Sequence, residues 1–274
     1  MSGQSIQLEK PICDVVPHIF KRPLLHVNPT DSLLTVATYL ALGPQIYVDG
    51  LVVLDNDKAV GIIGGRHTIE YILYHHKDWL HGAASDIMSQ PALMLDSDRL
   101  LINALDIFSK TGFAFVPITI SQKVVTTLSV RDVLKVAVDS KLETPIGEIS
   151  SRAITTTTKS SIGSALELML EEGVRSLIVL DNKRRVMIND RRILEYLLSH
   201  NGRQAVSSRG LEGLYETDIG TLDPVDVIRV EAETPANLAA ERLLDVNTPC
   251  LLLGDDAIVT PWDIVMKGLG RWSA

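Results

Sequence analysis

Residues 257–265 read Ala257-Ile258-Val259-Thr260-Pro261-Trp262-Asp263-Ile264-Val265. The pattern is a short apolar strand, a hydroxyl residue, two variable residues and an aspartate, followed by an apolar helix. The segment 124–134 repeats it as Val124-Val125-Thr126-Thr127-Leu128-Ser129-Val130-Arg131-Asp132-Val133-Leu134. The two hydroxyl residues are 131 positions apart, and so are the two aspartates, which is about half of the 274-residue chain. This spacing indicates an internal duplication.

Two weaker copies make the repeat four-fold. The positions equivalent to the hydroxyl residue are Gly64, Ser129, Asn189 and Thr260, at spacings of 65, 60 and 71 residues. Upstream of each, apolar residues recur at i, i+3, i+4 and i+7, which indicates one buried face of a helix. An alanine within each of these faces predicts a close helix contact. Two apolar runs joined by polar turn residues lie between that helix and the motif. The unit is therefore strand, helix, strand, strand, helix, and is about 60 residues long.

This unit resembles the CBS domain, named for cystathionine β-synthase. Supporting marks are Pro117 and Pro249 in the second strands and the apolar runs before each first strand, such as 12–16 and 146–149. Members of the family work in tandem pairs, so the resemblance implies an α/β (α+β) fold in which repeats 1 and 2, and repeats 3 and 4, form two pseudo-two-fold pairs. The expected bounds are 10–74, 83–138, 145–199 and 214–268 for repeats 1 to 4.

Composition narrows the class of protein. The chain is 46% hydrophobic and 22% charged, which is typical of a globular protein, and its net charge is −8. A nucleic-acid partner is therefore not expected, because such proteins usually present a basic face. No apolar run approaches the ~18 residues of a membrane span, and the polar N-terminus has no signal-peptide core. A cytoplasmic location is the resulting expectation.

The segments outside the repeats have plain interpretations. Residues 1–9 are expected to be a flexible leader, and 75–81, with three histidines, a polar helix end and linker rather than a metal site. Cys13 and Cys250 have no CxxC spacing. The polar stretch 200–213 is expected to be a flexible excursion, with a partner-binding loop as the alternative.

The two aspartates have two possible roles. Ser129 and Thr260 are good N-caps, and an acid three residues later, at Asp132 and Asp263, approximates a capping box. Pro261 suits the first helical position. The equivalent residues in repeats 1 and 3, however, are His67 and Arg192, so the helix does not require the acid. A helix N-terminus also suits phosphate, and a carboxylate can accept both hydrogen bonds of a ribose diol.

In the CBS family this acid contacts the ribose of adenosine nucleotides. The resemblance therefore implies that Asp132 and Asp263 hold ribose, with Ser129 and Thr260 beside them. Arg131 is either a phosphate contact or a surface side chain, and Trp262 could stack or face a cation. The candidate adenine clefts are lined in repeat 2 by Ile87, Ala92, Phe115, Val116 and Pro117, and in repeat 4 by Ile219, Val227, Thr248, Pro249 and Cys250. The expectation is one nucleotide per pair and two per chain.

The resulting hypothesis is a non-catalytic, energy-sensing regulatory protein that binds AMP, ADP or ATP and signals to an unknown protein partner, without a cofactor. Four repeats in one chain also resemble the regulatory γ subunit of AMP-activated kinase. Family members form disc-like dimers of pairs, so a homodimer is possible, although two pairs in one chain could complete one disc. The alternatives are an interaction or scaffold protein with vestigial sites, and an S-adenosylmethionine-binding CBS protein. No GxSxG, HExxH or GxxxxGK[ST] motif indicates an enzyme.

Overall fold

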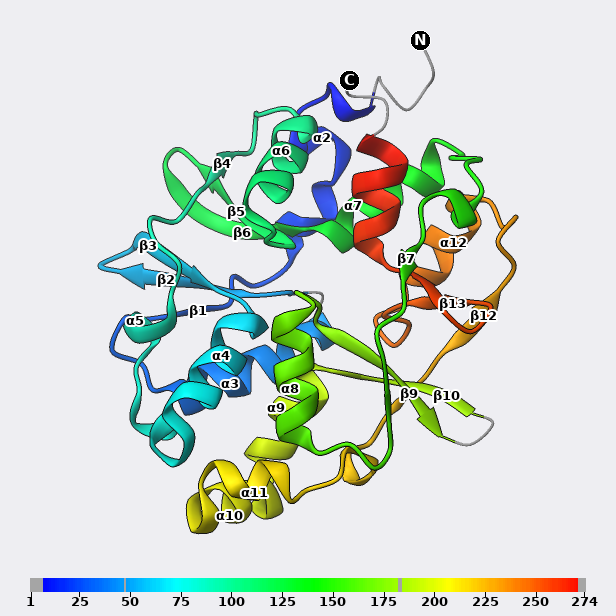
Figure 1. Ribbon diagram of the computed structural model, residues 1–274. Coiled ribbons are helices and arrows are strands. Elements are labelled where there is room, and N and C mark those ends of the chain that lie inside the picture. Colours follow the sequence, from blue (N-terminus) through cyan, green and yellow to red (C-terminus); the bar gives the residue numbers. More distant parts are fainter. Residues whose placement is uncertain (1–6, 47, 182–183, 271–274) are drawn as a thin grey trace.

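The computed structural model describes residues 7–46, 48–181 and 184–270, and within them each repeat has the predicted order of strand, helix, strand, strand and helix (Figure 1). Repeat 1 contains β1 (His26–Val27), α3 (Leu33–Leu42), β2 (Leu51–Asp55), β3 (Lys58–Ile63) and α4 (Gly65–His75). Repeat 2 contains β4 (Leu95–Asp96), α6 (Leu101–Thr111), β5 (Phe115–Ile120), β6 (Lys123–Ser129) and α7 (Val130–Asp139). Repeat 3 contains β8 (Thr155–Thr157), α8 (Ile162–Glu171), β9 (Ser176–Asp181), β10 (Arg184–Asn189) and α9 (Asp190–Leu198). Repeat 4 contains β12 (Ile228–Val230), α12 (Ala236–Leu243), β13 (Leu251–Leu253), β14 (Ala257–Val259) and the π-helix η6 (Asp263–Leu269).

Short elements precede or connect the repeats. Those before the repeats, here called leaders, are α2 (Ile12–Val15), η1 (Pro17–Lys21), α5 (Ala84–Ile87), η4 (Ile146–Glu148), β7 (Ser151–Arg152), η5 (Ile219–Thr221) and β11 (Val225–Asp226). The connecting elements are η2 (Gly43–Ile46), η3 (His76–His81), α10 (His200–Arg209) and α11 (Leu211–Tyr215).

The repeats of a pair exchange their leaders. β7, which precedes repeat 3, pairs with β14 in the sheet of repeat 4, and β11, which precedes repeat 4, pairs with β10 in the sheet of repeat 3. The first pair follows the same rule, with a bridge between Ser89 of the repeat 2 leader and Ile62 of repeat 1. In the other direction, the Thr126 hydroxyl of repeat 2 donates to the Ile19 carbonyl at 2.8 Å. Each pair is therefore one pseudo-symmetric unit, as the family resemblance implied.

The two pairs pack against each other through helices, with α3 against α9 and α7 against α12. As a result, the large cores cross from one pair to the other. The repeat 2–4 core joins residues of α6 and α7 to residues of α12 and η6, and the repeat 1–3 core joins α3 and α4 to α8 and α9. The alanines of the four helix faces are buried in these cores, as predicted: Ala37, Ala104, Ala165, Ala239 and Ala240. Figure 1 shows the four repeats arranged around a common centre.

Two segments predicted to be flexible contain residues with a defined structure. The expected leader 1–9 falls partly outside the described residues, but within it Leu8 is buried in the repeat 2–4 core. The polar stretch 200–213 is not a flexible excursion, because it forms α10 and most of α11. Val206 and Leu214 anchor these helices in the repeat 1–3 core. Two buried apolar residues thus fix a segment that is otherwise mostly polar.

Gly202 marks a close approach rather than a turn. A Cβ at this position would lie 2.0 Å from the carbonyl oxygen of Tyr196, which is backbone and cannot rotate away. We expect Gly202→Ala to destabilise the protein by roughly 1–3 kcal/mol, whereas alanine usually stabilises a helix by about 1 kcal/mol relative to glycine. Urea unfolding checks this, with the exposed Asn201→Ala as a control expected to stay within about 0.5 kcal/mol. A Gly202→Ala protein as stable as wild type would contradict the close approach.

No helix among the described residues is long and apolar enough to cross a membrane. Across the same residues, no group of three or more His, Cys, Asp or Glu side chains is placed to hold a metal ion.

Candidate functional site

A cavity of about 520 Å³ is lined by residues from all four repeats. Most lining residues come from two equivalent places in each repeat, just before the central strand and at the start of the final helix. Those before the central strand are Asp49, Gly112, Ala114, Gly173, Val174, Arg175, Ser176 and Pro249. Those at the helix starts are Arg66, Val130, Arg131, Asn189, Asp190, Arg191, Thr260, Pro261, Trp262 and Asp263. Ser151, Arg152, Ile154 and Ile258 complete the lining.

One position recurs around this cavity. The residues two places after Gly64, Ser129, Asn189 and Thr260 all line it, and they are Arg66, Arg131, Arg191 and Trp262. Sequence reasoning chose Arg131 and Trp262 but missed Arg66 and Arg191. The missed pair carries a sequence signal, because it occupies the same offset in the repeat alignment. These three arginines and the tryptophan, here called the offset ring, come from the four repeats in turn.

The cavity has more positive than negative side chains. Five arginines and three aspartates line it, although the whole chain carries a net charge of −8. Three of the arginines form ion pairs: Arg175 Nε lies 2.7 Å from Asp190 Oδ2, Arg191 lies 3.0 Å from Asp49 Oδ1, and Arg152 lies 3.3 Å from Glu172 Oε2. Arg131 donates to the Asp245 carbonyl at 3.0 Å and to that of Leu243.

Arg66 differs from these, because no hydrogen bond or ion pair engages it within the described part of the chain. Burial lowers the pKa of Arg191, and the neighbouring cations Arg175 and Arg131 lower it further, against the opposing effect of Asp49. The start of each final helix adds the positive end of its helix dipole. The cavity is therefore suited to an anion.

Asp263 stands at the edge of this cavity. Its Oδ2 accepts hydrogen bonds from the Thr260 N–H at 2.9 Å and from the Thr260 hydroxyl at 2.7 Å. Its Oδ1 accepts from the Ser151 hydroxyl at 2.6 Å and lies 2.8 Å from Lys267 Nζ. The capping role is thus present in the structure, and Asp263 also reaches a cavity that could hold a ligand. Its role toward ribose stays a prediction.

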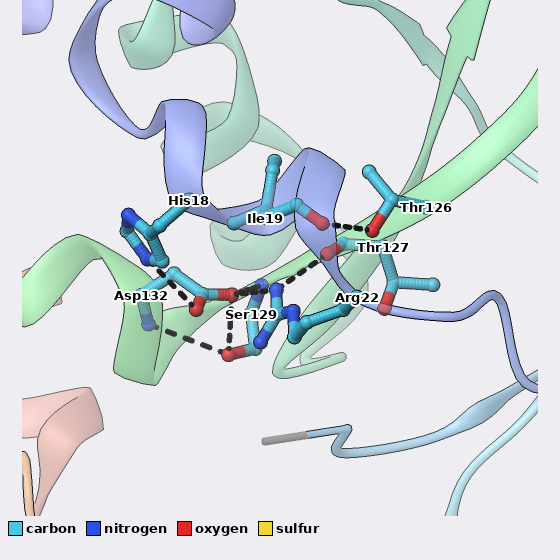
Figure 2. A network of polar contacts seen from close by, with 7 residues as sticks. All are labelled: His18, Ile19, Arg22, Thr126, Thr127, Ser129 and Asp132. Atoms are coloured by element: carbon cyan, nitrogen blue, oxygen red, sulfur yellow. Dashed lines mark hydrogen bonds and ion pairs between the residues drawn. The ribbon is translucent and has the colours of Figure 1, made fainter. Parts of the chain in front are cut away.

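Asp132 has different surroundings, shown in Figure 2. Its Oδ2 accepts from the Ser129 N–H at 2.8 Å and from the Ser129 hydroxyl at 2.9 Å, and it lies 2.8 Å from a guanidinium nitrogen of Arg22. Its Oδ1 lies 3.4 Å from Nε2 of His18. Val130 and Arg131 of the same helix start line the cavity, but Asp132 does not belong to that lining. Sequence reasoning did not foresee that His18 and Arg22 would surround this acid.

These partners stabilise the ionised form of Asp132. Burial acts to raise the pKa of its carboxyl group, but the hydrogen bond from His18 and the charge and hydrogen bond of Arg22 outweigh burial. The pKa of Asp132 is therefore lowered from its ordinary value, and the group is ionised at neutral pH.

Repeats 1 and 3 start their final helices without this acid. In repeat 1, the Gly64 N–H lies 3.1 Å from Nδ1 of His67, so the imidazole replaces the carboxylate as the acceptor. Burial lowers the pKa of His67, which fits a neutral ring that accepts. In repeat 3, Asn189 Oδ1 accepts from the Arg192 N–H, while the Arg192 side chain pairs with Glu195 at 2.8 Å. Both arrangements support the view that the acid is optional for folding.

The adenine candidates of repeat 2 do not share one cleft. Ile87 is buried in the repeat 1–3 core, whereas Val116 is buried in the repeat 2–4 core. The Phe115 ring lies against the backbone of Gly50, where an added Cβ would come within 2.1 Å of it. Pro117 is buried and Ala92 half-buried. The grouping of Ile87 with repeat 2 was wrong because the leaders are exchanged, so Ile87 serves repeat 1.

Several of the adenine candidates of repeat 4 lie at or near the cavity, but Ile219, like Ile87, was grouped with the wrong repeat. Pro249 lines the cavity with Thr260, Trp262 and Asp263. Cys250 belongs to a small apolar cluster of repeats 3 and 4 against which Val227 and the cavity residue Ile258 pack. Ile219, from the repeat 4 leader, lies in the repeat 1–3 core instead.

Two further candidates are buried without lining the cavity. Thr248 donates its backbone N–H to the Asp245 carbonyl at 3.0 Å. Burial raises the pKa of the Cys250 thiol to about 12, so this thiol is neutral at physiological pH.

Comparisons with known proteins agree with this architecture. Residues 84–139 match the family model described as "CBS domain". The fold is similar to that of a Methanocaldococcus jannaschii protein described as an archaeal homologue of γ-AMPK, with a TM-score of 0.77, 19% identity, and coverage of 92% of this chain and 97% of that one. It is also similar to a conserved protein from Pyrococcus horikoshii, with a TM-score of 0.53, 16% identity, and coverage of 81% and 92% respectively. A search of curated protein sequences found no match.

Proposed function

Because residues 84–139 match the CBS-domain family model, we propose that this chain is a regulatory CBS-domain protein that binds an adenosine nucleotide in the central cavity. It would have no catalytic activity of its own and would pass the signal to a protein partner. The observation that supports this most is the offset ring. It places Arg66, Arg131, Arg191 and Trp262 from four separate repeats around one space. Three guanidinium groups suit a chain of phosphates, and an indole ring suits a base.

Asp263 is the proposed ribose contact. A ribose hydroxyl could replace the Ser151 hydroxyl on Oδ1, and Lys267, whose side chain is 41% exposed, could turn to water and leave room for a second hydroxyl, while Thr260 keeps its hydrogen bonds to Oδ2. Pro249 and Ile258 offer apolar surface for the adenine in the same cavity. The volume of about 520 Å³ lies within the usual range of small-molecule sites, roughly 300–1,000 Å³.

The nucleotide hypothesis is favoured over its two rivals. S-adenosylmethionine also has a ribose diol and an adenine, but it is cationic at sulfur, and the excess of arginines around the cavity disfavours a cation. A scaffold protein with vestigial sites would have no need of Arg66, an arginine without a polar partner in the described part of the chain.

Regulation would follow from the position of the cavity between the pairs. A ligand touching Asp263 in the second pair and Arg66 and Arg131 in the first would favour the arrangement of the pairs that brings these residues together. Such a ligand shifts a conformational equilibrium by its difference in affinity for the two states. A partner protein that contacts both pairs could then respond to occupancy.

Calorimetric titration with AMP, ADP, ATP, adenosine, S-adenosylmethionine and NAD tests this proposal. We expect the phosphorylated adenosines to bind, and at ~100 times the dissociation constant to raise the unfolding free energy by about 2.7 kcal/mol. Asp263→Asn should weaken binding at least ~10-fold, because a hydrogen bond to a charged group contributes about 1.5–3 kcal/mol.

Matched variants separate ribose from phosphate recognition. Arg66→Ala should weaken ATP while leaving adenosine unchanged, and Asp106→Asn, at an exposed site on α6, should alter neither. If none of the adenosine ligands binds the wild-type protein, the interaction-protein alternative replaces this proposal.

A further inference from the structure

We infer that the segment Pro17–Arg22 is a built-in occupant of the repeat 2 acid, so that the chain binds one nucleotide, at Asp263, and not two. This inference rests on the proposed function and concerns its stoichiometry. Asp132 and Asp263 are equivalent in sequence and both cap their helices. They differ in the side chains that the exchanged leader places on the carboxylate, which are Arg22 and His18 at Asp132 and Ser151 at Asp263.

Both oxygens of Asp132 are already taken by side chains of the repeat 1 leader. Arg22 contributes a full charge to Oδ2, and the same guanidinium nitrogen donates to the Thr127 carbonyl at 3.0 Å. His18 covers Oδ1 (Figure 2). The side chains of Arg22 and Asp132 are 12% and 4% exposed, so this ion pair is shielded from water. A ribose diol offers only neutral hydroxyl groups and cannot replace a buried guanidinium without leaving it unpaired.

The leader is fixed in this position. Ile19, in the middle of η1, is fully buried, and its carbonyl accepts the hydrogen bond from Thr126 at 2.8 Å. Val16, just before η1, is also fully buried. Moving Arg22 out of the site would therefore expose apolar side chains of the repeat 2–4 core and break a buried hydrogen bond.

The leader of repeat 3 is shorter, and the acid beside it, Asp263 of repeat 4, lines the cavity although its side chain is only 3% exposed. The bridges from Pro11 to Leu100 and from Pro145 to Pro235 align the two leaders. From Ile12 to the first strand residue His26 is 14 positions, but from Ile146 to Thr155 is only 9. The additional residues of repeat 1 form η1. At the matching place repeat 3 has β7, whose Ser151 and Arg152 line the cavity.

The stoichiometry of calorimetric titration with ATP on the full chain tests the inference. We expect one site per chain, at least a 10-fold loss of affinity in Asp263→Asn, and an unchanged dissociation constant and stoichiometry in Asp132→Asn. Two sites in the wild type, or loss of a site in Asp132→Asn with the fold intact by circular dichroism, would overturn the inference while leaving the proposed function standing. Absence of any binding would instead overturn both.

Removal of the occupant gives a second, independent measurement. Arg22→Ala should gain a weaker second site, and that site should disappear in the Arg22→Ala/Asp132→Asn protein. A folded Arg22→Ala protein that still binds one ATP would contradict the role of Arg22 as occupant. If Arg22→Ala does not fold, the inference is tested by the wild-type stoichiometry and by the ATP affinities of Asp132→Asn and Asp263→Asn.

Discussion

Replacement of Arg22 by alanine is expected to lower the free energy of unfolding by about 3–5 kcal/mol. The Asp132 side chain is almost fully buried, and its nearest full positive charge is the Arg22 guanidinium at 2.8 Å. Without Arg22, the carboxylate must stay charged in a poorly solvated place or take up a proton, and both are costly. Urea unfolding at pH 7 measures the effect.

The matched control is Arg184→Ala. Arg184 pairs with Asp226 at 2.7 Å, nearly the same distance as in the Arg22–Asp132 pair. The side chains of Arg184 and Asp226, however, are 67% and 83% exposed. Because exposed ion pairs contribute roughly 0–1 kcal/mol, this variant should be nearly neutral. Equal effects of the two substitutions would show that burial of Asp132 has no energetic importance.

The difference between wild type and Arg22→Ala should also depend on pH. The folded-state pKa of Asp132 is lowered relative to its ordinary value, so the stabilisation is fully present above that ordinary value. It is lost as the pH falls through the lowered pKa, where the carboxylate becomes protonated. The unfolding free energies of wild type and Arg22→Ala should therefore differ most at pH 7 and converge in acid, and a difference that widens in acid would contradict the assignment.

Trp79→Ala is expected to cost about 3–5 kcal/mol. Trp79 lies in η3, between repeats 1 and 2, with only 1% of its surface exposed in the repeat 1–3 core. Its truncation would leave a cavity between helices of both pairs. Thermal or urea unfolding checks this, with Tyr74→Ala as the control, because Tyr74 is a 72% exposed aromatic residue five positions away. A loss below about 1 kcal/mol would mean that the site collapses around the smaller side chain.

The features set by local sequence were predictable. The caps at Ser129 and Asn189 and the strands on either side of each polar turn follow from short-range patterns, and four copies in register identified the repeat. The polar stretch 200–213 was misjudged for the opposite reason. There, single inward residues such as Val206 fix the structure, and composition averages them away. The segment 75–81 is the helix end and linker that was predicted, but its buried Trp79 was not foreseen.

The candidate site was only half predictable. Asp263, Arg131 and Trp262 stand in the motif itself, so the sequence singled them out, and all three line the cavity. Arg175 and Arg152 reach the cavity because four repeats close around a centre and because leaders cross between them. Such placement depends on tertiary geometry. The leader exchange also explains why Ile87 and Ile219 were assigned to the wrong repeats.

The sharing of each large core between repeats of different pairs has a consequence for biosynthesis. Repeat 2 buries α7 against α12, whose first residue, Ala236, is translated almost 100 residues after the end of α7 at Asp139. While the nascent chain emerges from the ribosome, the apolar face of α7 has no partner until repeat 4 has been synthesised. We therefore expect the first half of the chain to be prone to aggregation while it is being synthesised. The yield of folded protein in the cell should then depend on how soon the second half is synthesised, or on a chaperone that binds the apolar face of α7 until then.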